Sequence, residues 1–212
     1  MGETGAGKSL IAQAILGTLP KALRAEGEIF LNSRRVDTLA RRERATLWGR
    51  EITSLPQEPW NALDPLMAAW QQVAETYRFV TRLSAHSARS ATSEQLISLG
   101  LNGKERRLPS QLSGGMAQRV AFAAATAARA PIVLADEPTK GLDLNRQARI
   151  VEMLEKVPNE GGTLIAITHD VSVAKALGGD LIVLRHGQLV EKGPTGDILA
   201  NPQDEYLSLI HI

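Results

Sequence analysis

Gly2-Glu3-Thr4-Gly5-Ala6-Gly7-Lys8-Ser9 stands almost at the start of the chain and matches the pattern G-x-x-x-x-G-K-[ST] in full. Glycines in this pattern let the backbone curl so that successive N–H groups point inward, and a following helix adds the partial positive charge of its N-terminus. The apolar residues up to Leu19 have the spacing of such a helix. These residues are therefore predicted to form a loop that binds phosphate groups, in which Lys8 reaches the β- and γ-phosphates and Ser9 is a ligand of Mg²⁺.

An apolar run at residues 132–135 ends in two acids, Asp136 and Glu137. An open α/β sheet binds its ligands at the carboxyl ends of its strands, so this pair is expected beside the phosphate-binding loop. Asp136 is expected to help hold Mg²⁺, through water, and Glu137 to orient and polarise the attacking water. Without the loop, the same two residues would be interpreted as surface acids at the end of a strand.

The rest of the chain alternates between short apolar runs and helical patterns. Short runs separated by helices predict parallel strands covered on both faces, and hence an α/β fold with a mostly parallel sheet. The last run is expected to turn at His186-Gly187 into a hairpin. Strands are predicted at 28–32, 132–135, 164–168, 181–184 and 188–191, and helices at 66–81, 90–100, 116–129 and 144–156.

Composition excludes several classes of function. The hydrophobic share of 43% and the charged share of 22% indicate a globular chain, and the net charge of +1 provides no field that would gather DNA, RNA or anionic lipid. The absence of cysteine excludes disulfides, thiol nucleophiles and cysteine-ligated clusters. The longest apolar stretch, 120–135, is too short and too interrupted to span a bilayer, and the start has no features of a secretory signal, so a cytoplasmic location is expected.

A third motif, Leu112-Ser113-Gly114-Gly115-Met116, precedes Gln118, Arg119 and an alanine-rich helical pattern. Taken alone, it is equally an ordinary glycine turn before a helix. In order along the chain, however, it stands with the phosphate-binding loop, Gln57, the acid pair, Gly141-Leu142-Asp143 and His169. This succession resembles the nucleotide-binding subunit of the ATP-binding cassette (ABC) family over essentially the whole chain.

The resemblance implies a P-loop NTPase of ABC type, with one domain over residues 1–212. Its core would comprise 1–62 and 131–212, and the inserted helical subdomain 63–130. It also implies an ATPase, which converts ATP and water to ADP and phosphate with ATP and Mg²⁺ bound. Two subunits would sandwich two nucleotides head to tail, so that each site is completed in trans and one subunit alone hydrolyses poorly.

The resemblance also implies roles for individual residues. Ser113, Gly114 and Gly115 would bind the nucleotide held by the opposite subunit, and Asp143 would bridge the two sites. His169 would hydrogen-bond the γ-phosphate as a catalytic residue. Gln57 would join the Mg²⁺–water shell and report the γ-phosphate to the helical subdomain. The remaining histidines are interpreted as surface residues: His86, His186 and His211.

Residues 57–65 resemble the Q-[DE]-P-x-x-x-L-[ND]-P stretch of ATPases that energise oligopeptide, dipeptide and nickel importers. The pair Asn201-Pro202 followed by Tyr206 resembles a motif near the end of those subunits. This branch implies transmembrane permease partners, an indirect extracytoplasmic solute-binding protein, and a peripheral place on the inner face of the cell membrane. Pro56 departs from the aromatic residue usual before the glutamine, and phosphonate-utilisation ATPases share several of these signals.

Two other classes compete with transport. One is an ABC ATPase of DNA repair, translation or cluster assembly. DNA-repair members insert coiled coils or zinc modules between the phosphate-binding loop and the Leu-Ser-Gly-Gly motif, and here those two motifs are separated by a stretch without heptads or cysteines. Translation members carry two cassettes, and one is found here. A degenerate nucleotide sensor is disfavoured because Glu137 and His169 are both present. No nucleic-acid partner is expected.

Met1 stands directly before the loop, without the apolar strand and the adenine-stacking aromatic residue usual in the family. The chain is therefore expected to be truncated at its N-terminus, and also at its C-terminus, and to fold weakly or bind ATP poorly.

Overall fold

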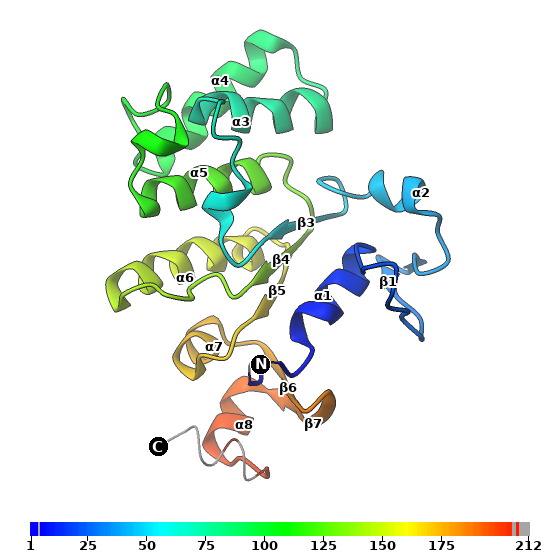
Figure 1. The fold of residues 1–212 in the computed structure, drawn as a ribbon. Coiled ribbons are helices and arrows are strands. Elements are labelled where there is room, and N and C mark those ends of the chain that lie inside the picture. Colours follow the sequence, from blue (N-terminus) through cyan, green and yellow to red (C-terminus); the bar gives the residue numbers. More distant parts are fainter. Residues whose placement is uncertain (4, 205–206, 208–212) are drawn as a thin grey trace. The chain divides into compact units, whose positions relative to one another are not determined.

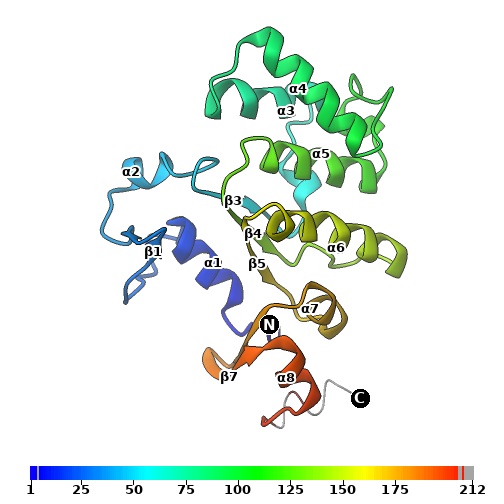
Figure 2. The same ribbon diagram turned by 180° about the vertical axis from the view of Figure 1, so that it is seen from behind.

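The computed structural model describes residues 1–3, 5–204 and 207, which form two compact units (Figures 1 and 2). The first unit comprises Met1–Leu39 and Asp136–Ile212, and the second comprises Ala40–Ala135. The predicted helical subdomain, 63–130, lies within the second unit, and its boundaries stay a prediction.

The second segment of the first unit begins with the expected alternation of helix and strand and ends in a hairpin and a short helix. Helix α6 (Leu144–Asn159) leads to strand β5 (Thr163–Ile167), which leads to helix α7 (Val171–Leu177). The strands β6 (Asp180–Arg185) and β7 (Gln188–Pro194) pair antiparallel, and helix α8 (Thr195–Ala200) follows. The predicted hairpin is confirmed: His186 and Gly187 both have positive φ, 48° and 77°, as a tight two-residue turn requires.

The N-terminal segment of the first unit contains helix α1 (Lys8–Leu16) and a small ribbon of strands β1 (Phe30–Leu31) and β2 (Arg34–Arg35). The predicted strand 28–32 is thus shorter than expected. Asn32 and Ser33 turn the chain back with φ of 47° and 65°.

Apolar side chains from both segments of the first unit share one core. Fully buried Val183 of β6 lies in a cluster with residues of α7 and α8 and with Met1. Next to Met1, Gly2 forms a parallel bridge with Leu184, and the Leu184 N–H donates to Met1 O at 2.9 Å. The backbone that enters the phosphate-binding loop is therefore held against β6.

The second unit combines a pair of parallel strands with helices. Strand β3 (Ile52–Leu55) pairs in parallel with β4 (Ile132–Asp136), with Ile52 opposite Ile132 and Leu55 opposite Ala135. The other elements are α2 (Arg41–Ala45), the 3₁₀ turns η1 (Pro59–Ala62) and η3 (Pro109–Gln111), α3 (Ala69–Glu75), the π-helical turn η2 (Thr76–Val80), α4 (Ala85–Ser98) and α5 (Gly114–Thr126). No described helix combines the length and the apolar character that a bilayer-spanning segment needs.

Several predicted boundaries in the second unit were wrong. The helix predicted over 66–81 begins only at Ala69, because the Leu66 N–H bonds to the Asp64 carboxylate in a turn. The helix predicted from Met116 begins at Gly114, where the Ser113 hydroxyl accepts a hydrogen bond from the Met116 N–H at 3.3 Å. A side-chain cap offsets the low helix propensity of two successive glycines.

A first prediction concerns Gly2, whose φ is 153° and where an added Cβ would lie 2.1 Å from Leu184 O. Gly2→Ala is expected to lower the free energy of unfolding by about 1–3 kcal/mol, because two backbone segments must separate. Urea unfolding measures the effect. Gly196→Ala is the matched control: a Cβ there meets nothing within 4 Å, and alanine suits the helix better, so stability should hold or rise. Equal stability of the Gly2 variant and the wild type would contradict the close approach.

Candidate nucleotide-binding site

The phosphate-binding loop takes the curled form that its glycines predict. Gly5 and Gly7 both have φ of 87°, and Gly7 is the N-cap of α1. The Gly7 carbonyl accepts from the N–H groups of Leu10 and Ile11 at 3.0 and 3.1 Å, and the cap has no side chain to cover the helix end. The N-terminus of α1, with its backbone N–H groups, can therefore bind an anion in this loop. The predicted contribution of Thr4 lies outside the described residues.

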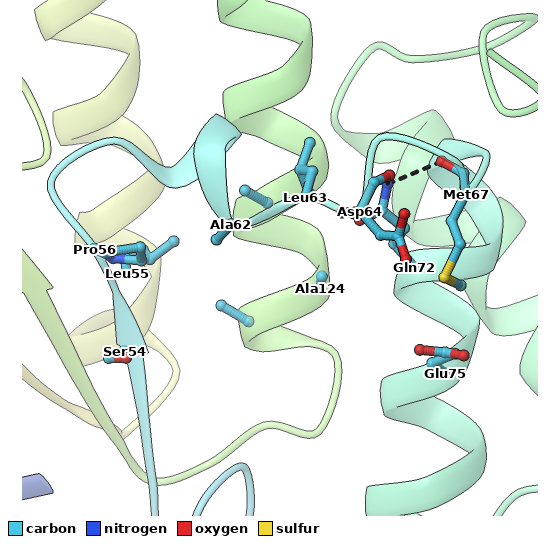
Figure 3. Close-up of a pocket in the computed structure, with 12 residues that line it drawn as sticks. Ser54, Leu55, Pro56, Ala62, Leu63, Asp64, Met67, Gln72, Glu75 and Ala124 are labelled. Atoms are coloured by element: carbon cyan, nitrogen blue, oxygen red, sulfur yellow. Dashed lines mark hydrogen bonds between the residues drawn. The ribbon is translucent and has the colours of Figure 1, made fainter. Parts of the chain in front are cut away.

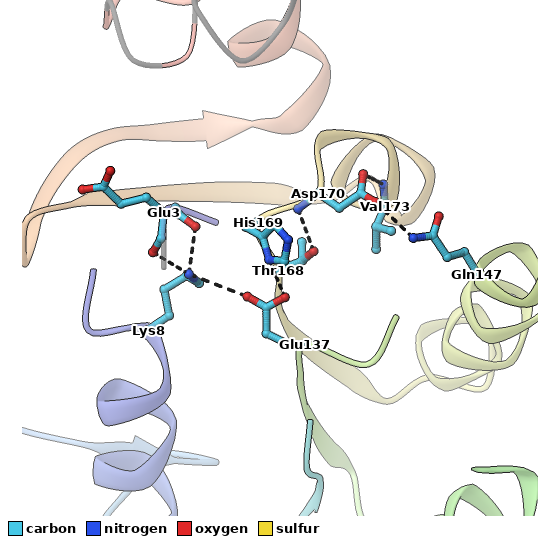
Figure 4. Close-up of polar contacts among 9 residues, drawn as sticks. Glu3, Lys8, Glu137, Gln147, Thr168, His169, Asp170 and Val173 are labelled. Carbon is cyan, nitrogen blue, oxygen red and sulfur yellow. Dashed lines mark hydrogen bonds and ion pairs between the residues drawn. The ribbon is translucent and has the colours of Figure 1, made fainter. Parts of the chain in front are cut away.

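Lys8 is buried, with 7% of its surface exposed, at the first position of α1. Its ammonium group donates to Gly2 O and Glu3 O, both at 2.8 Å, and lies 3.7 Å from Glu137 Oε1 (Figure 4). A buried charge needs partners of this kind. The lysine is thus held inside the loop, close to a carboxylate that lies far away in sequence.

Glu137 follows β4 directly and is 8% exposed. Its φ of 48° is unusual for a residue other than glycine, and its N–H donates to Ile167 O at 2.8 Å, at the end of β5. Backbone strain of this kind persists only where the surroundings hold it. The turn directs the Glu137 carboxylate between Lys8 and His169.

His169 completes the group: its Nδ1 lies 2.7 Å from Glu137 Oε2 (Figure 4). An ionised carboxylate can only accept, so Nδ1 carries the proton in this contact and Nε2 is left to accept or, in the charged ring, to donate. The His169 side chain is 45% exposed, so a ligand can reach it. The structure therefore brings together three of the predicted residues, from the loop and from the ends of two strands.

Asp136 has a buried carboxylate oxygen, Oδ1, with no hydrogen-bond partner in the described part of the chain. Such an atom in a native site calls for water or an ion, and a carboxylate oxygen is a ligand that Mg²⁺ prefers. Among the described residues, no group of three or more acidic or histidine side chains could hold a metal by itself. Asp136 and the exposed Ser9 fit an ion that takes its other ligands from water and phosphates.

Asp170, a residue to which the sequence analysis assigned no role, anchors the segment after His169. Its Oδ1 accepts from Ser172 N at 2.8 Å, from Ser172 Oγ at 2.6 Å and from Val173 N at 3.4 Å, which caps α7. Gln147 of α6 donates to its other oxygen at 3.4 Å. Burial raises the pKa of this carboxyl, but the bonds from Ser172 and Val173 outweigh burial, and the pKa falls below its usual value.

Asp170→Ala is expected to lower the free energy of unfolding by about 0.5–2 kcal/mol, because α7 loses its N-cap. Since the pKa of Asp170 is depressed in the folded state, the stabilisation is complete above the unfolded pKa of about 3.9 and is lost as the pH falls through the folded value. Urea unfolding should therefore show a difference from wild type that is full at pH 7 and shrinks in acid. Asp170→Asn, which retains a capping oxygen, should lose less. A difference that grows in acid would contradict the cap.

The other predicted site residues lie at the N-termini of helices or in turns. Asp143, in the first unit, is the N-cap of α6: its carboxylate accepts from Arg146 N at 3.0 Å and pairs with the Arg146 guanidinium at 3.2 Å. In the second unit, Ser113 and Gly114 are exposed at the start of α5, where Gly115 is half-buried. His186 is exposed as predicted, but its Nδ1 also lies 3.1 Å from Glu3 Oε1, a contact for which the sequence carried no signal.

Gln57 is half-buried and follows β3 by two residues. Its neighbour Pro56 lines a cavity of about 350 Å³ inside the second unit, between β3, η1, α3 and α5 (Figure 3). The side-chain amide of Gln72, which also lines this cavity, donates to Asp64 O at 3.2 Å and to Met67 O at 3.0 Å. Small alanines on α5 leave the space open. Movement of the Gln57 segment would change the shape of this cavity.

Comparison with known proteins decides the family. The sequence model of the ABC transporter family matches residues 1–140. The chain belongs to this family. The dipeptide transport ATP-binding protein DppD of Bacillus subtilis is 32% identical over 97% of this chain and 63% of its own length. OppD of the same organism, an oligopeptide transport ATP-binding protein, is 35% identical over 82% of this chain and 50% of its own length.

A third relative is the peptidoglycan transport ATP-binding protein YejF of Agrobacterium fabrum, which is 35% identical over 97% of this chain and 39% of its own length. The chain thus spans only part of the length of the curated relatives that it matches. Among solved structures, the ABC cassette MJ0796, described as a dimer bound to ADP and Pi, matches with a TM-score of 0.79 and 32% identity. The match covers 92% of this chain and 83% of that one. The predicted ABC-type P-loop fold with its parallel sheet core is confirmed.

Proposed function

We propose that this chain binds and hydrolyses ATP as the ATP-binding subunit of an ABC importer of peptides. The observation that carries the proposal is the contact of Glu137 with both Lys8 and His169, at 3.7 and 2.7 Å. It combines a phosphate-binding cation, a base and a histidine in one place. Similarity to DppD and OppD, named for dipeptide and oligopeptide transport, supports the cargo class.

Each group of residues at the site has a separate role in binding and hydrolysing ATP. The backbone amides of the phosphate-binding loop and the N-terminus of α1 bind the phosphate groups of ATP. Lys8 exchanges its two carbonyl partners for the β- and γ-phosphates. Glu137 accepts a proton from the attacking water. His169 hydrogen-bonds the γ-phosphate, which requires either a charged ring or release of Nδ1 from Glu137. Gln57 contacts the site once the γ-phosphate is present.

Mg²⁺, when bound, would neutralise the charge that develops on the phosphates. Ser9, Asp136 and Gln57 are the residues that would hold it, and the unpartnered Asp136 oxygen supports this assignment.

The ATPase acts as a pair of cassettes. Ser113, Gly114 and Gly115 at the start of α5 face the nucleotide of a second ABC ATPase subunit, and Asp143 contacts the opposite site. The dimeric state in the description of MJ0796 supports this arrangement. In the whole protein, transmembrane permease subunits place the ATPase at the inner face of the membrane, and an extracytoplasmic solute-binding protein delivers the cargo.

Similarity to YejF over 97% of the chain favours a second cargo, peptidoglycan fragments. The two cargo classes can be distinguished by an uptake assay. It compares labelled peptides with labelled peptidoglycan fragments in cells with and without the gene. Loss of peptide uptake alone supports the first cargo, and loss of fragment uptake alone supports the second.

ATP turnover at different protein concentrations tests the mechanism. Because each site is completed by a second subunit, activity per molecule in the presence of Mg²⁺ is expected to rise with protein concentration and then level off. Activity per molecule that stays constant down to concentrations at which the protein is monomeric would contradict completion in trans.

A further inference from the structure

A cavity in the second unit is lined by none of the residues that were assigned a role above. It has a volume of about 270 Å³ and is formed by α3, α4 and the segment before η3. Its lining comprises Trp70, Arg89, Thr92, Ser93, Gly103, Glu105, Arg106 and Arg107. Sites for drug-sized ligands usually measure about 300–1,000 Å³, so this cavity suits a small ligand.

The charge of the lining is strongly one-sided. Arg89, Arg106 and Arg107 bring three guanidinium groups, against the single carboxylate of Glu105. None of the three arginines forms an ion pair with a residue in the described ranges. The Glu105 carboxylate instead accepts from Gly103 N at 3.0 Å. Arg107 Nη1 donates only to a neutral acceptor, Gln111 O, at 3.3 Å. The cavity therefore has an excess of positive charge that no carboxylate of the described residues neutralises.

A buried hydroxyl group points to a missing partner. Thr92 of α4 is 1% exposed, and its Oγ1 has no hydrogen-bond partner among the residues that the structure describes. A buried polar atom of this kind costs stability unless something satisfies it. Because Thr92 lines the cavity, a ligand inside it is the available partner.

The walls are held in place before any ligand arrives. Ala69 N donates to Arg107 O and Trp70 N to Glu105 O, both at 2.9 Å, which ties the segment at 105–107 to α3. The Arg89 guanidinium stacks on the Trp70 ring, 4.6 Å from its centroid. Such preorganisation lowers the entropic cost of binding.

We propose that this cavity binds a small phosphate-bearing ligand, with the arginines as charge partners and the Thr92 hydroxyl as a hydrogen-bond donor. A phosphate monoester carries about −1.5 to −2 charges at pH 7, which matches the excess of guanidinium over carboxylate in the lining. Planar guanidinium groups also bind phosphate oxygens in pairs. The site shares no residue with the phosphate-binding loop, and binding there does not require ATP hydrolysis.

The test follows the indole N–H signal of Trp70 in ¹H–¹⁵N spectra of the full chain during titration with inorganic phosphate and with phenyl phosphate, at constant ionic strength set with chloride. Trp70→Phe assigns the signal among the three tryptophans. The Lys8→Ala variant, titrated in parallel, removes binding at the glycine loop. We expect a saturable shift in both backgrounds. Tighter binding of phenyl phosphate identifies a phosphate monoester, and equal or tighter binding of inorganic phosphate identifies free phosphate as the ligand.

Three variants decide the proposal. Arg106→Gln with Arg107→Gln should weaken phosphate binding by at least about tenfold, whereas Arg78→Gln, which removes an exposed charge outside the cavity, should not. Thr92→Val should weaken binding while leaving the urea midpoint unchanged or higher, because the hydroxyl has no partner within the described chain. If the double variant does not fold, the affinity for phosphate is measured with Arg106→Gln alone. A linear shift that chloride reproduces, or unchanged affinity in the folded arginine variants, would overturn the proposal.

Discussion

Glu137→Gln is expected to lower the rate of ATP hydrolysis by about 10²- to 10⁴-fold, the usual contribution of a general base. Glutamine has the same shape and keeps an oxygen that can accept from His169 Nδ1, now 2.7 Å from the carboxylate. It cannot take a proton from water. ATP affinity should not fall, because the carboxylate 3.7 Å from Lys8 competes with phosphate for the ammonium group.

An ATP-bound dimer should therefore accumulate in the Glu137→Gln variant, and size-exclusion chromatography with ATP and Mg²⁺ measures it. Glu152→Gln, at an exposed position on α6, removes the same charge and should hydrolyse ATP like the wild type. A Glu137→Gln chain that stays monomeric with bound ATP would count against the sandwich mechanism, and unchanged turnover would count against Glu137 as the base.

Lys8→Ala is expected to weaken ATP binding by about 10- to 100-fold and to abolish measurable turnover. A hydrogen bond to a charged group contributes about 1.5–3 kcal/mol, which corresponds to that range of affinity. In the structure this ammonium group already lies within the loop, bonded to Gly2 O and Glu3 O, so it is positioned to meet the phosphates without a large movement.

Calorimetric titration with ATP and Mg²⁺ measures the effect of Lys8→Ala, and circular dichroism shows whether the variant is folded. Lys192→Ala, an exposed lysine on β7 in the same unit, is the matched control and should bind ATP normally. The same turnover in the Lys8 variant as in the wild type would contradict the phosphate-binding role of the loop and, with it, the proposed function.

Features encoded by neighbouring residues could be predicted well. The glycine pattern of the loop, the helix after it, the acid pair at the end of an apolar strand and the turn at His186-Gly187 depend on local backbone preferences. Strand β3 could not be predicted, because Thr53 and Ser54 interrupt its apolar pattern and its partner β4 lies far along the chain. Helix α7 is only seven residues long and depends on the Asp170 cap.

The amino-acid sequence by itself therefore determined the family, the fold class and the residue types at the site, since a motif is a local pattern of backbone freedom and charge. Only the tertiary structure decided which groups meet: Glu137 between Lys8 and His169, the Asp136 oxygen without a partner, and the arginine-lined cavity around Thr92. Distances and burial arise when strands and helices remote in sequence pack together, and no periodicity along the chain records them.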